Sequence, residues 1–143
     1  MGLVGGCTFA IMTDMKRDIE NANDIQLMVD TFYKKVLADE TIGYIFRETI
    51  NWETHMPLMY RFWGSMLLGE QSYQSNPMAK HIALDKRYPL DMAHFNRWLE
   101  IWEQNLDEHF AGPMKDQALV RAKNIASVME YKVRRSRTKG AIL

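Results

Sequence analysis

The sequence Asn-Pro-Met-Ala-Lys-His-Ile-Ala-Leu spans residues 76–84, near the middle of the 143-residue chain. Pro77 fits the first position of a helix, because the backbone N–H that proline lacks would have no partner there. We therefore predict a short helix of about two turns that ends before the polar residues 85–87. His81 lies in the middle of this helix among apolar neighbours, which makes it our first candidate for a metal-binding side chain.

The composition is typical of one globular domain, with 47% hydrophobic and 25% charged residues. Lys+Arg and Asp+Glu number 18 each, so the net charge gives no indication of nucleic-acid or membrane binding. No apolar run reaches the roughly 18 residues of a membrane span. The single Cys7 excludes an internal disulfide and is consistent with a cytoplasmic location. The 11 Met residues suggest a core shaped around an irregular group, although a mobile core without a ligand explains them equally.

Helical periodicity dominates the chain, and we predict an all-α domain of six or seven helices. A first short helix over residues 13–21 has few apolar residues, whereas the next one is strongly amphipathic and is expected to be capped by Asn23. Its apolar face consists of Ile25, Met28, Val29, Phe32, Tyr33, Val36 and Leu37. The Tyr33 hydroxyl therefore points inward, where a backbone carbonyl or a water molecule is its expected partner. Residues 40–46 are predicted to form a turn or a short helix.

Another amphipathic pattern begins at Asn51 and ends at Gly69. Its apolar face consists of Trp52, His55, Met59, Phe62, Trp63, Met66 and Leu67. His55 therefore points into the predicted core. Pro57 is harmless if Thr54 caps the helix, but it is expected to bend the helix at His55 if Asn51 is the cap.

The second half of the chain predicts two longer helices. The first is expected to start at Asp91, and its apolar positions are Phe95, Trp98, Leu99, Trp102 and Leu106. Gly112-Pro113 is a stop-and-restart signal. The last helix has as its apolar positions Met114, Ala118, Leu119 or Val120, Ile125, Val128 and Met129. We expect a basic, disordered tail at residues 134–143 that binds no nucleic acid, a flexible extension at residues 1–12, and a single domain at residues 13–133.

Four histidines compete as metal ligands, and their positions alone do not decide between them. His81 is favoured by its short helix, His55 and His94 share helix faces with apolar residues, and His109 lies near a polar helix end. A di-iron site would need Glu-x-x-His on two helices, and the nearest match, residues 91–94, occurs once. Haem needs only one imidazole and an apolar slot. The residues therefore leave a haem protein and a haem-free helical interaction module both open.

Several sequence blocks, in this order, resemble the group III truncated haemoglobins. They are Phe32-Tyr33-Lys34-Lys35-Val36, Gly43-Tyr44-Ile45-Phe46, Trp52-x-x-His55, Phe62-Trp63-Gly64-Ser65-Met66-Leu67-Leu68-Gly69-Glu70, Pro77-Met78-Ala79-Lys80-His81 and His94-Phe95-x-x-Trp98-Leu99. The resemblance implies a truncated globin, a two-over-two helical sandwich around haem b (iron protoporphyrin IX). It also implies that His81 is the iron ligand, that Tyr33 and Trp98 hydrogen-bond to bound dioxygen, and that His55 swings in and out of the pocket.

The resemblance further implies a set of residues that contact the haem, with His81 among them. The others are Phe46, Met59, Phe62, Trp63, Met78, Lys80 and Phe95. Two donors beside dioxygen would slow its release, so the implied function is ligand chemistry or nitrosative and oxidative stress defence rather than oxygen transport. Activity of the nitric oxide dioxygenase or peroxidase type would need an external reductase, and nitric oxide and carbon monoxide are further expected ligands. A haem-based gas sensor is an alternative, weakened by the lack of an attached output domain.

Overall fold

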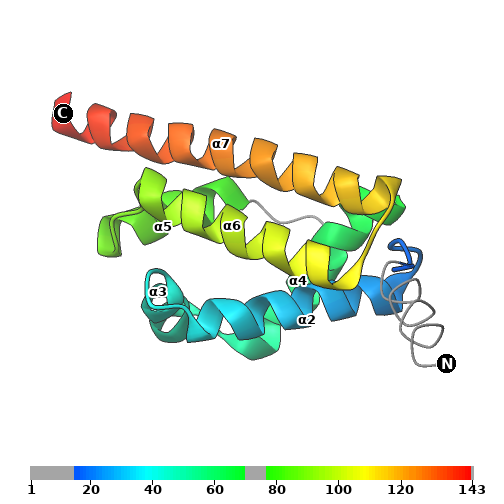
Figure 1. The fold of residues 1–143 in the computed structure, drawn as a ribbon. Coiled ribbons are helices and arrows are strands. Elements are labelled where there is room, and N and C mark those ends of the chain that lie inside the picture. Colours follow the sequence, from blue (N-terminus) through cyan, green and yellow to red (C-terminus); the bar gives the residue numbers. More distant parts are fainter. Residues whose placement is uncertain (1–14, 70–76, 143) are drawn as a thin grey trace, which may run out of the picture.

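The computed structural model describes residues 15–69 and 77–142, which form six helices and no strand (Figure 1). The helices are α2 (Ala22–Ala38), α3 (Gly43–Thr49), α4 (Trp52–Leu68), α5 (Pro77–Arg87), α6 (Met92–His109) and α7 (Pro113–Ile142). The all-α prediction is confirmed for this part of the chain. The predicted extension at residues 1–12 lies outside it. No helix among the described residues has the length and apolar character needed to cross a membrane.

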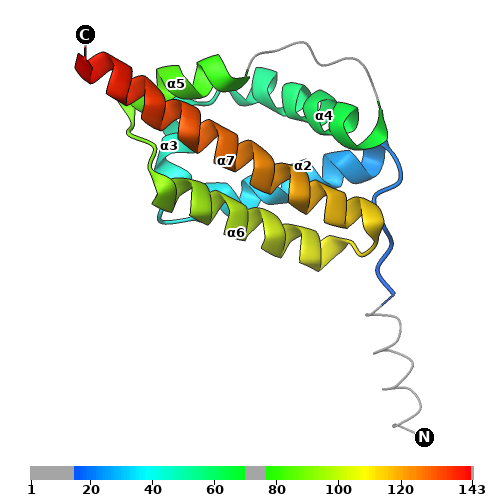
Figure 2. The same cartoon turned by 90° about the horizontal axis from the view of Figure 1, so that it is seen from above.

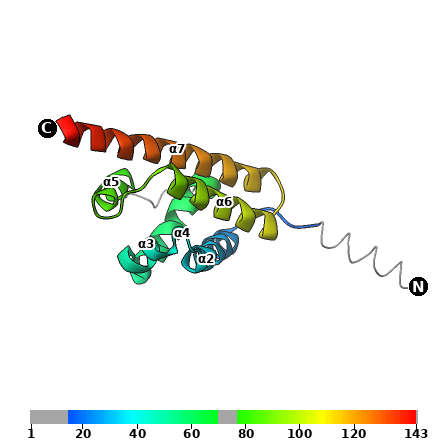
Figure 3. The same cartoon turned by 60° about the vertical axis from the view of Figure 1, so that its left-hand side comes forward.

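The helices form two layers. α6 and α7 run antiparallel and cover α2 and α4, and Figure 2 shows the same arrangement from above. The short α3 follows α2 and packs against it. α5 lies beside the C-terminal half of α7, as Figure 3 also shows, and its Ile82 and Leu84 pack against a cluster of buried residues that includes Phe95 of α6 and Met129 of α7. The main core therefore lies between the layers, and a second, smaller core lies among α3, α6 and α7, with half-buried side chains of α5 packed against it.

Residues 15–20 are not helical, so the short first helix predicted there is wrong for the part that the structure describes. Asp18 instead accepts hydrogen bonds from the backbone N–H groups of Met114 (2.9 Å) and Lys115 (2.8 Å). These donors lie in the first turn of α7, where a helix offers them no partner. Gly112 (φ 136°) permits this approach, because a Cβ there would lie 2.6 Å from the Asp18 carboxyl carbon. The segment before α2 therefore caps a helix that is distant in sequence.

α2 begins two residues earlier than predicted, because its N-cap is Asn21 rather than Asn23. Asn21 accepts from the backbone N–H of Asp24, whose own carboxylate accepts from the Asn21 backbone N–H, so the two residues form a capping box. The predicted apolar face is confirmed as core. Its buried members are Ile25, Met28, Val29, Phe32, Tyr33 and Val36.

α4 begins at Trp52 with Asn51 as its N-cap, and it continues through Pro57. Thr54 is therefore not the cap. Gly69 ends the helix in the left-handed conformation (φ 75°), as its position after the last apolar residue predicts. Trp63 and Leu67 of the predicted apolar face are buried, and Trp52, His55, Met59, Phe62 and Met66 are half-buried.

α6 starts after Asp91 as predicted, and Asp91 and His94 form its capping box. Trp102 is 1% exposed, stacks on Trp63 at a centroid distance of 4.5 Å, and donates from its indole N–H to the Ala118 carbonyl (3.2 Å). The prediction for α7 was partly wrong, because Val128 is 46% exposed. The buried side of α7 consists of Ala118, Ala122, Ala126, Met129 and Val133. The buried face was hard to predict because alanine contributes little to apolar periodicity, whereas the exposed valines Val120 and Val128 contribute more.

The predicted disordered tail is not observed over the described residues, because α7 continues to Ile142. Arg137 reaches the buried carboxylate of Asp85 on α5. The predicted end of α5 was also too early, since residues 85–87 belong to the helix. Asp85 was counted as part of a polar break, but it points inward and accepts from the Leu90 backbone N–H (2.8 Å).

Candidate functional site

A cavity of about 400 Å³ is lined by side chains from all six described helices. Its size falls in the range of about 300–1,000 Å³ that is usual for small-molecule sites. The walls are mostly aliphatic and aromatic, and a few polar groups converge on the cavity from α2, α4, α5 and α6. Another hollow, on the outer surface of α6, is open to solvent and lined by charged and polar side chains. The cavity lined by all six described helices is therefore the candidate site.

The structure brings the predicted site residues together. Those that line the cavity are Tyr33, Phe46, His55, Met59, Phe62, Trp63, Lys80, His81, Phe95 and Trp98. Met78 belongs to α5, but its side chain lies outside the described residues. Our sequence reasoning missed Thr49, Asn51 and Thr54, which also line the cavity. These residues are polar and lie at or near helix ends, so no apolar periodicity could have marked them.

Tyr33 and His55 form a hydrogen-bonded pair at the cavity wall. The Tyr33 hydroxyl lies 2.8 Å from Nε2 of His55, and the Tyr33 side chain is 7% exposed. The prediction of a backbone or water partner for this hydroxyl is thus wrong. Burial raises the pKa of the Tyr33 phenol well above its usual value, so the hydroxyl keeps its proton. Tyr33 can donate this proton to a ligand in the cavity when Nε2 of His55 carries the imidazole proton and donates to the Tyr33 oxygen.

The imidazole of His55 is held in its neutral form. Burial, followed by the positive charges of His81 and Lys80, lowers the pKa of His55 to about 4. A neutral imidazole has one donor and one acceptor nitrogen, so His55 can either accept from Tyr33 or donate to it. Lys80 and His81 of α5 line the same cavity as His55 of α4.

Three indole rings form an aromatic wall of the cavity. Trp98 lies parallel to Trp102, with an interplanar angle of 2° and a centroid distance of 5.8 Å, and Trp63 stacks on Trp102 as well. Phe32 contacts both Trp98 and Trp102 edge-on. These ring contacts fix the position of Trp98 along the cavity.

The remaining histidines differ in their surroundings. His94 lines the cavity, but its Nδ1 lies 2.8 Å from the carboxylate of Asp91 in the cap of α6. His109 lies at the end of α6, with Nδ1 2.9 Å from the Asn105 carbonyl. His81 is half-buried at the cavity, on the helix that opened our sequence argument.

The donor set fits haem better than a bare metal ion. Among the described residues, no group of three or more His, Cys, Asp or Glu side chains could hold a metal ion. Haem brings its own four nitrogen ligands and asks the protein for an imidazole and an apolar slot. His81 and the aromatic walls supply both. Lys80 is exposed at the same cavity, where its ammonium group could pair with a carboxylate of a bound molecule.

Comparison with known proteins agrees with this geometry. The chain is 35% identical over 118 residues to a group 3 truncated hemoglobin of Campylobacter jejuni, a match that covers 79% of this chain and 91% of that protein. The crystal structure of the group III truncated hemoglobin from Campylobacter jejuni has a TM-score of 0.75 and 33% identity, and the match covers 83% of this chain and 95% of that one. No family model matches the chain. The likeness confirms the predicted truncated globin fold.

Proposed function

Because the chain belongs to the group III truncated haemoglobins, we propose that it binds haem b in this cavity, with His81 as the residue that would hold the iron. Globins hold haem through a histidine, and the haem iron supplies the site that binds a diatomic gas. The apolar lining, the position of His81 and the exposed Lys80 support this assignment. Dioxygen, nitric oxide and carbon monoxide are the proposed ligands.

The observation that carries the rest of the proposal is the Tyr33–His55 pair inside an apolar cavity. Tyr33 keeps its proton, and His55 stays neutral, so the pair uses one proton in its own hydrogen bond and can offer the other to a ligand without a full charge. Trp98 adds an indole N–H on the same cavity. Donors of this kind favour a ligand that carries partial negative charge, as dioxygen does once it is held by ferrous iron.

Strong hydrogen bonding favours a function in ligand chemistry over oxygen transport. A hydrogen bond to a charged group contributes about 1.5–3 kcal/mol, and each 1.4 kcal/mol is about a factor of ten in a rate. Two donors would therefore slow oxygen release by orders of magnitude. We propose a reaction of dioxygen with nitric oxide, or turnover of peroxide or nitrite, as a defence against nitrosative or oxidative stress. Such a cycle would use an external reductase, and we place it in the cytoplasm on the basis of the single Cys7.

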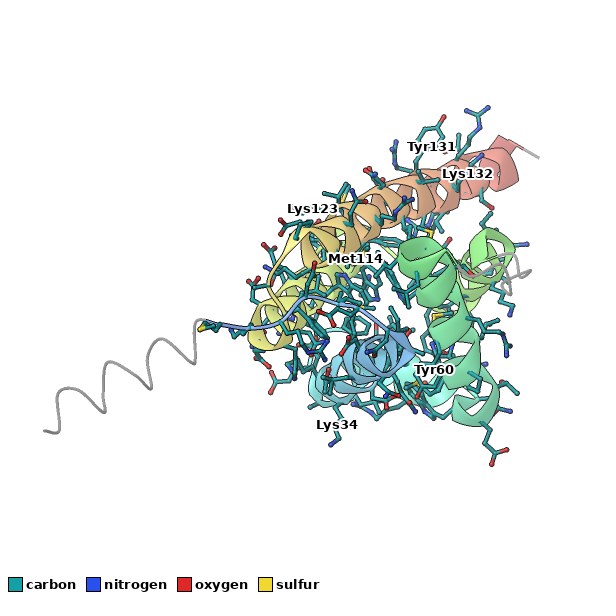
Figure 4. All side chains as sticks on the ribbon, turned by 90° about the vertical axis from the view of Figure 1, so that its right-hand side faces the viewer. Lys34, Tyr60, Met114, Lys123, Tyr131 and Lys132 are labelled. Atoms are coloured by element: carbon teal, nitrogen blue, oxygen red, sulfur yellow. The ribbon has the colours of Figure 1, made fainter. Side chains whose placement is uncertain are left out.

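The test is the rate of oxygen dissociation from the ferrous protein, measured by stopped-flow in the Tyr33→Phe variant. Removal of one donor is expected to raise this rate by about 10- to 150-fold. Tyr60→Phe is the matched control, because the Tyr60 hydroxyl donates to the Asp30 carboxylate and its side chain does not line the cavity (Figure 4). An unchanged rate of oxygen dissociation in Tyr33→Phe would contradict the proposed role of Tyr33.

A further inference from the structure

A buried carboxylate anchors the helix that carries His81. Asp85 is 7% exposed and accepts from the backbone N–H of Leu90 at 2.8 Å. Arg137 of α7 donates to both carboxylate oxygens of Asp85, with its Nε 2.9 Å from Oδ2, and it also donates to the Leu90 carbonyl at 2.8 Å. One guanidinium therefore joins the end of α5, the connection to α6 and the last turns of α7.

The Asp85–Arg137 ion pair is significant because of its position relative to His81. Residues 81 and 85 are four apart in a helix, so their side chains lie on the same side of α5, one turn from each other. A rotation or shift of α5 that released Asp85 would therefore move the imidazole as well.

Apolar packing gives α5 little support of its own. The side chains of α5 that the structure describes are those of residues 80–87. Among them Asp85 is the only buried one, and Ile82 and Leu84 are half-buried. By contrast, most of the inward face of α2 is buried. Tyr88, just after α5, donates to Glu48 of α3, but that bond is exposed. The bidentate contact with Arg137 is the partly buried, charge-assisted one, which is the stronger kind.

We propose that Arg137 is a positioning residue for His81, which sets the orientation of α5 and thereby the bond between the imidazole and the haem iron. This inference rests on the proposed function, in which His81 is the axial ligand. It gives the basic end of α7 a role that its sequence, a run of Lys and Arg after Tyr131, did not suggest.

The experiment compares Arg137→Met and Arg137→Lys with the unmodified protein, all reconstituted with haem. The iron–histidine stretching band of the ferrous protein is measured by resonance Raman, and the rate of haem transfer to an excess of apomyoglobin is measured by absorption. Arg137→Met is expected to shift or broaden the band and to speed haem transfer several-fold. Arg137→Lys keeps the charge but loses the bidentate geometry, so its iron–histidine band and its rate of haem transfer are expected to lie between those of Arg137→Met and the unmodified protein.

Arg134→Met is the matched control. Arg134 lies on the same helix, is exposed, and pairs with Glu130 and with the ring of Tyr131, which projects from the outer side of α7 (Figure 4). This variant is expected to leave the band and the transfer rate unchanged. Asp85→Asn is the second test variant in case Arg137→Met does not fold, and it is expected to shift the band in the same way.

The outcomes separate the two claims. A band and a transfer rate unchanged in both Arg137→Met and Asp85→Asn would overturn the positioning role and leave the proposed function intact. Loss of stability with an unchanged band would also overturn it, because a purely structural ion pair would not alter the iron–histidine bond. If the unmodified protein has no iron–histidine band that depends on His81, the proposed function fails, and this inference fails with it.

Discussion

The two helices that supply Tyr33 and His81 are held in different ways. Tyr33 lies on α2, where Phe32 is 1% exposed and contacts the rings of Tyr33, Trp98 and Trp102. α5 instead has half-buried apolar side chains and one buried carboxylate. Tyr33, the proposed donor to the ligand, is thus positioned by close packing, whereas we propose that the helix of the iron ligand is positioned largely by an ion pair. Substitutions on the two sides should therefore affect different properties.

The largest effect is expected from Phe32→Ala on α2. Truncation of a fully buried Phe typically costs about 3–5 kcal/mol, because it removes apolar burial and leaves a cavity. Ile82→Ala on α5 is the comparison, and the cost is expected to be smaller because Ile82 is half-buried. Guanidinium unfolding of both variants measures the two free energies of unfolding. Equal losses would mean that α5 is packed as firmly as α2, against our account.

A smaller effect concerns the burial of His55 and the charges that α5 places near it. The pKa of His55 is about 4 in the folded protein, below its ordinary value of 6.5. As the pH falls from 6.5 towards 4, the unfolded chain takes up this proton before the folded protein does. The free energy of unfolding of the haem-free protein is therefore expected to decrease over that window, and His55 contributes no further change above or below it.

Urea unfolding of the haem-free protein at several pH values checks this expectation, with His55→Leu as the control that cannot bind the proton. The decrease between pH 6.5 and 4 should be smaller in His55→Leu than in the unmodified protein. An identical pH dependence would show that His55 is not held neutral at the cavity wall.

Much of the fold could be predicted from the sequence because the helices that matter most have strong apolar periodicity. The inward face of α2 and the aromatic face of α6 are examples, and the predicted site residues with described side chains all line one cavity. Periodicity also predicted that His55 points into the interior. It could not choose His81 over His55 or His94, and that choice came from the resemblance to a known family.

The interactions that could not be predicted join residues far apart in sequence. Asp18 caps α7 across 96 positions, and Arg137 binds Asp85 across 52. A charged residue in a polar run looks the same in the sequence whether it is solvated or buried, so Asp85 was misread as part of a polar break, and no role was predicted for Asp18. The Tyr33–His55 hydrogen bond was missed for a related reason. Periodicity predicts that both side chains point inward, but it does not predict which inward side chains are in contact.

The most direct test of the central claim is the absorption spectrum of the His81→Gly variant after reconstitution with hemin and reduction. The unmodified protein is expected to show a strong Soret band and the spectrum of a histidine-ligated ferrous haem. His81→Gly should lose that spectrum, and added imidazole should restore it by filling the space that the side chain left. His94→Gly, which alters another histidine at the same cavity, should keep it. An unchanged spectrum in His81→Gly, or its loss in His94→Gly, would contradict the account.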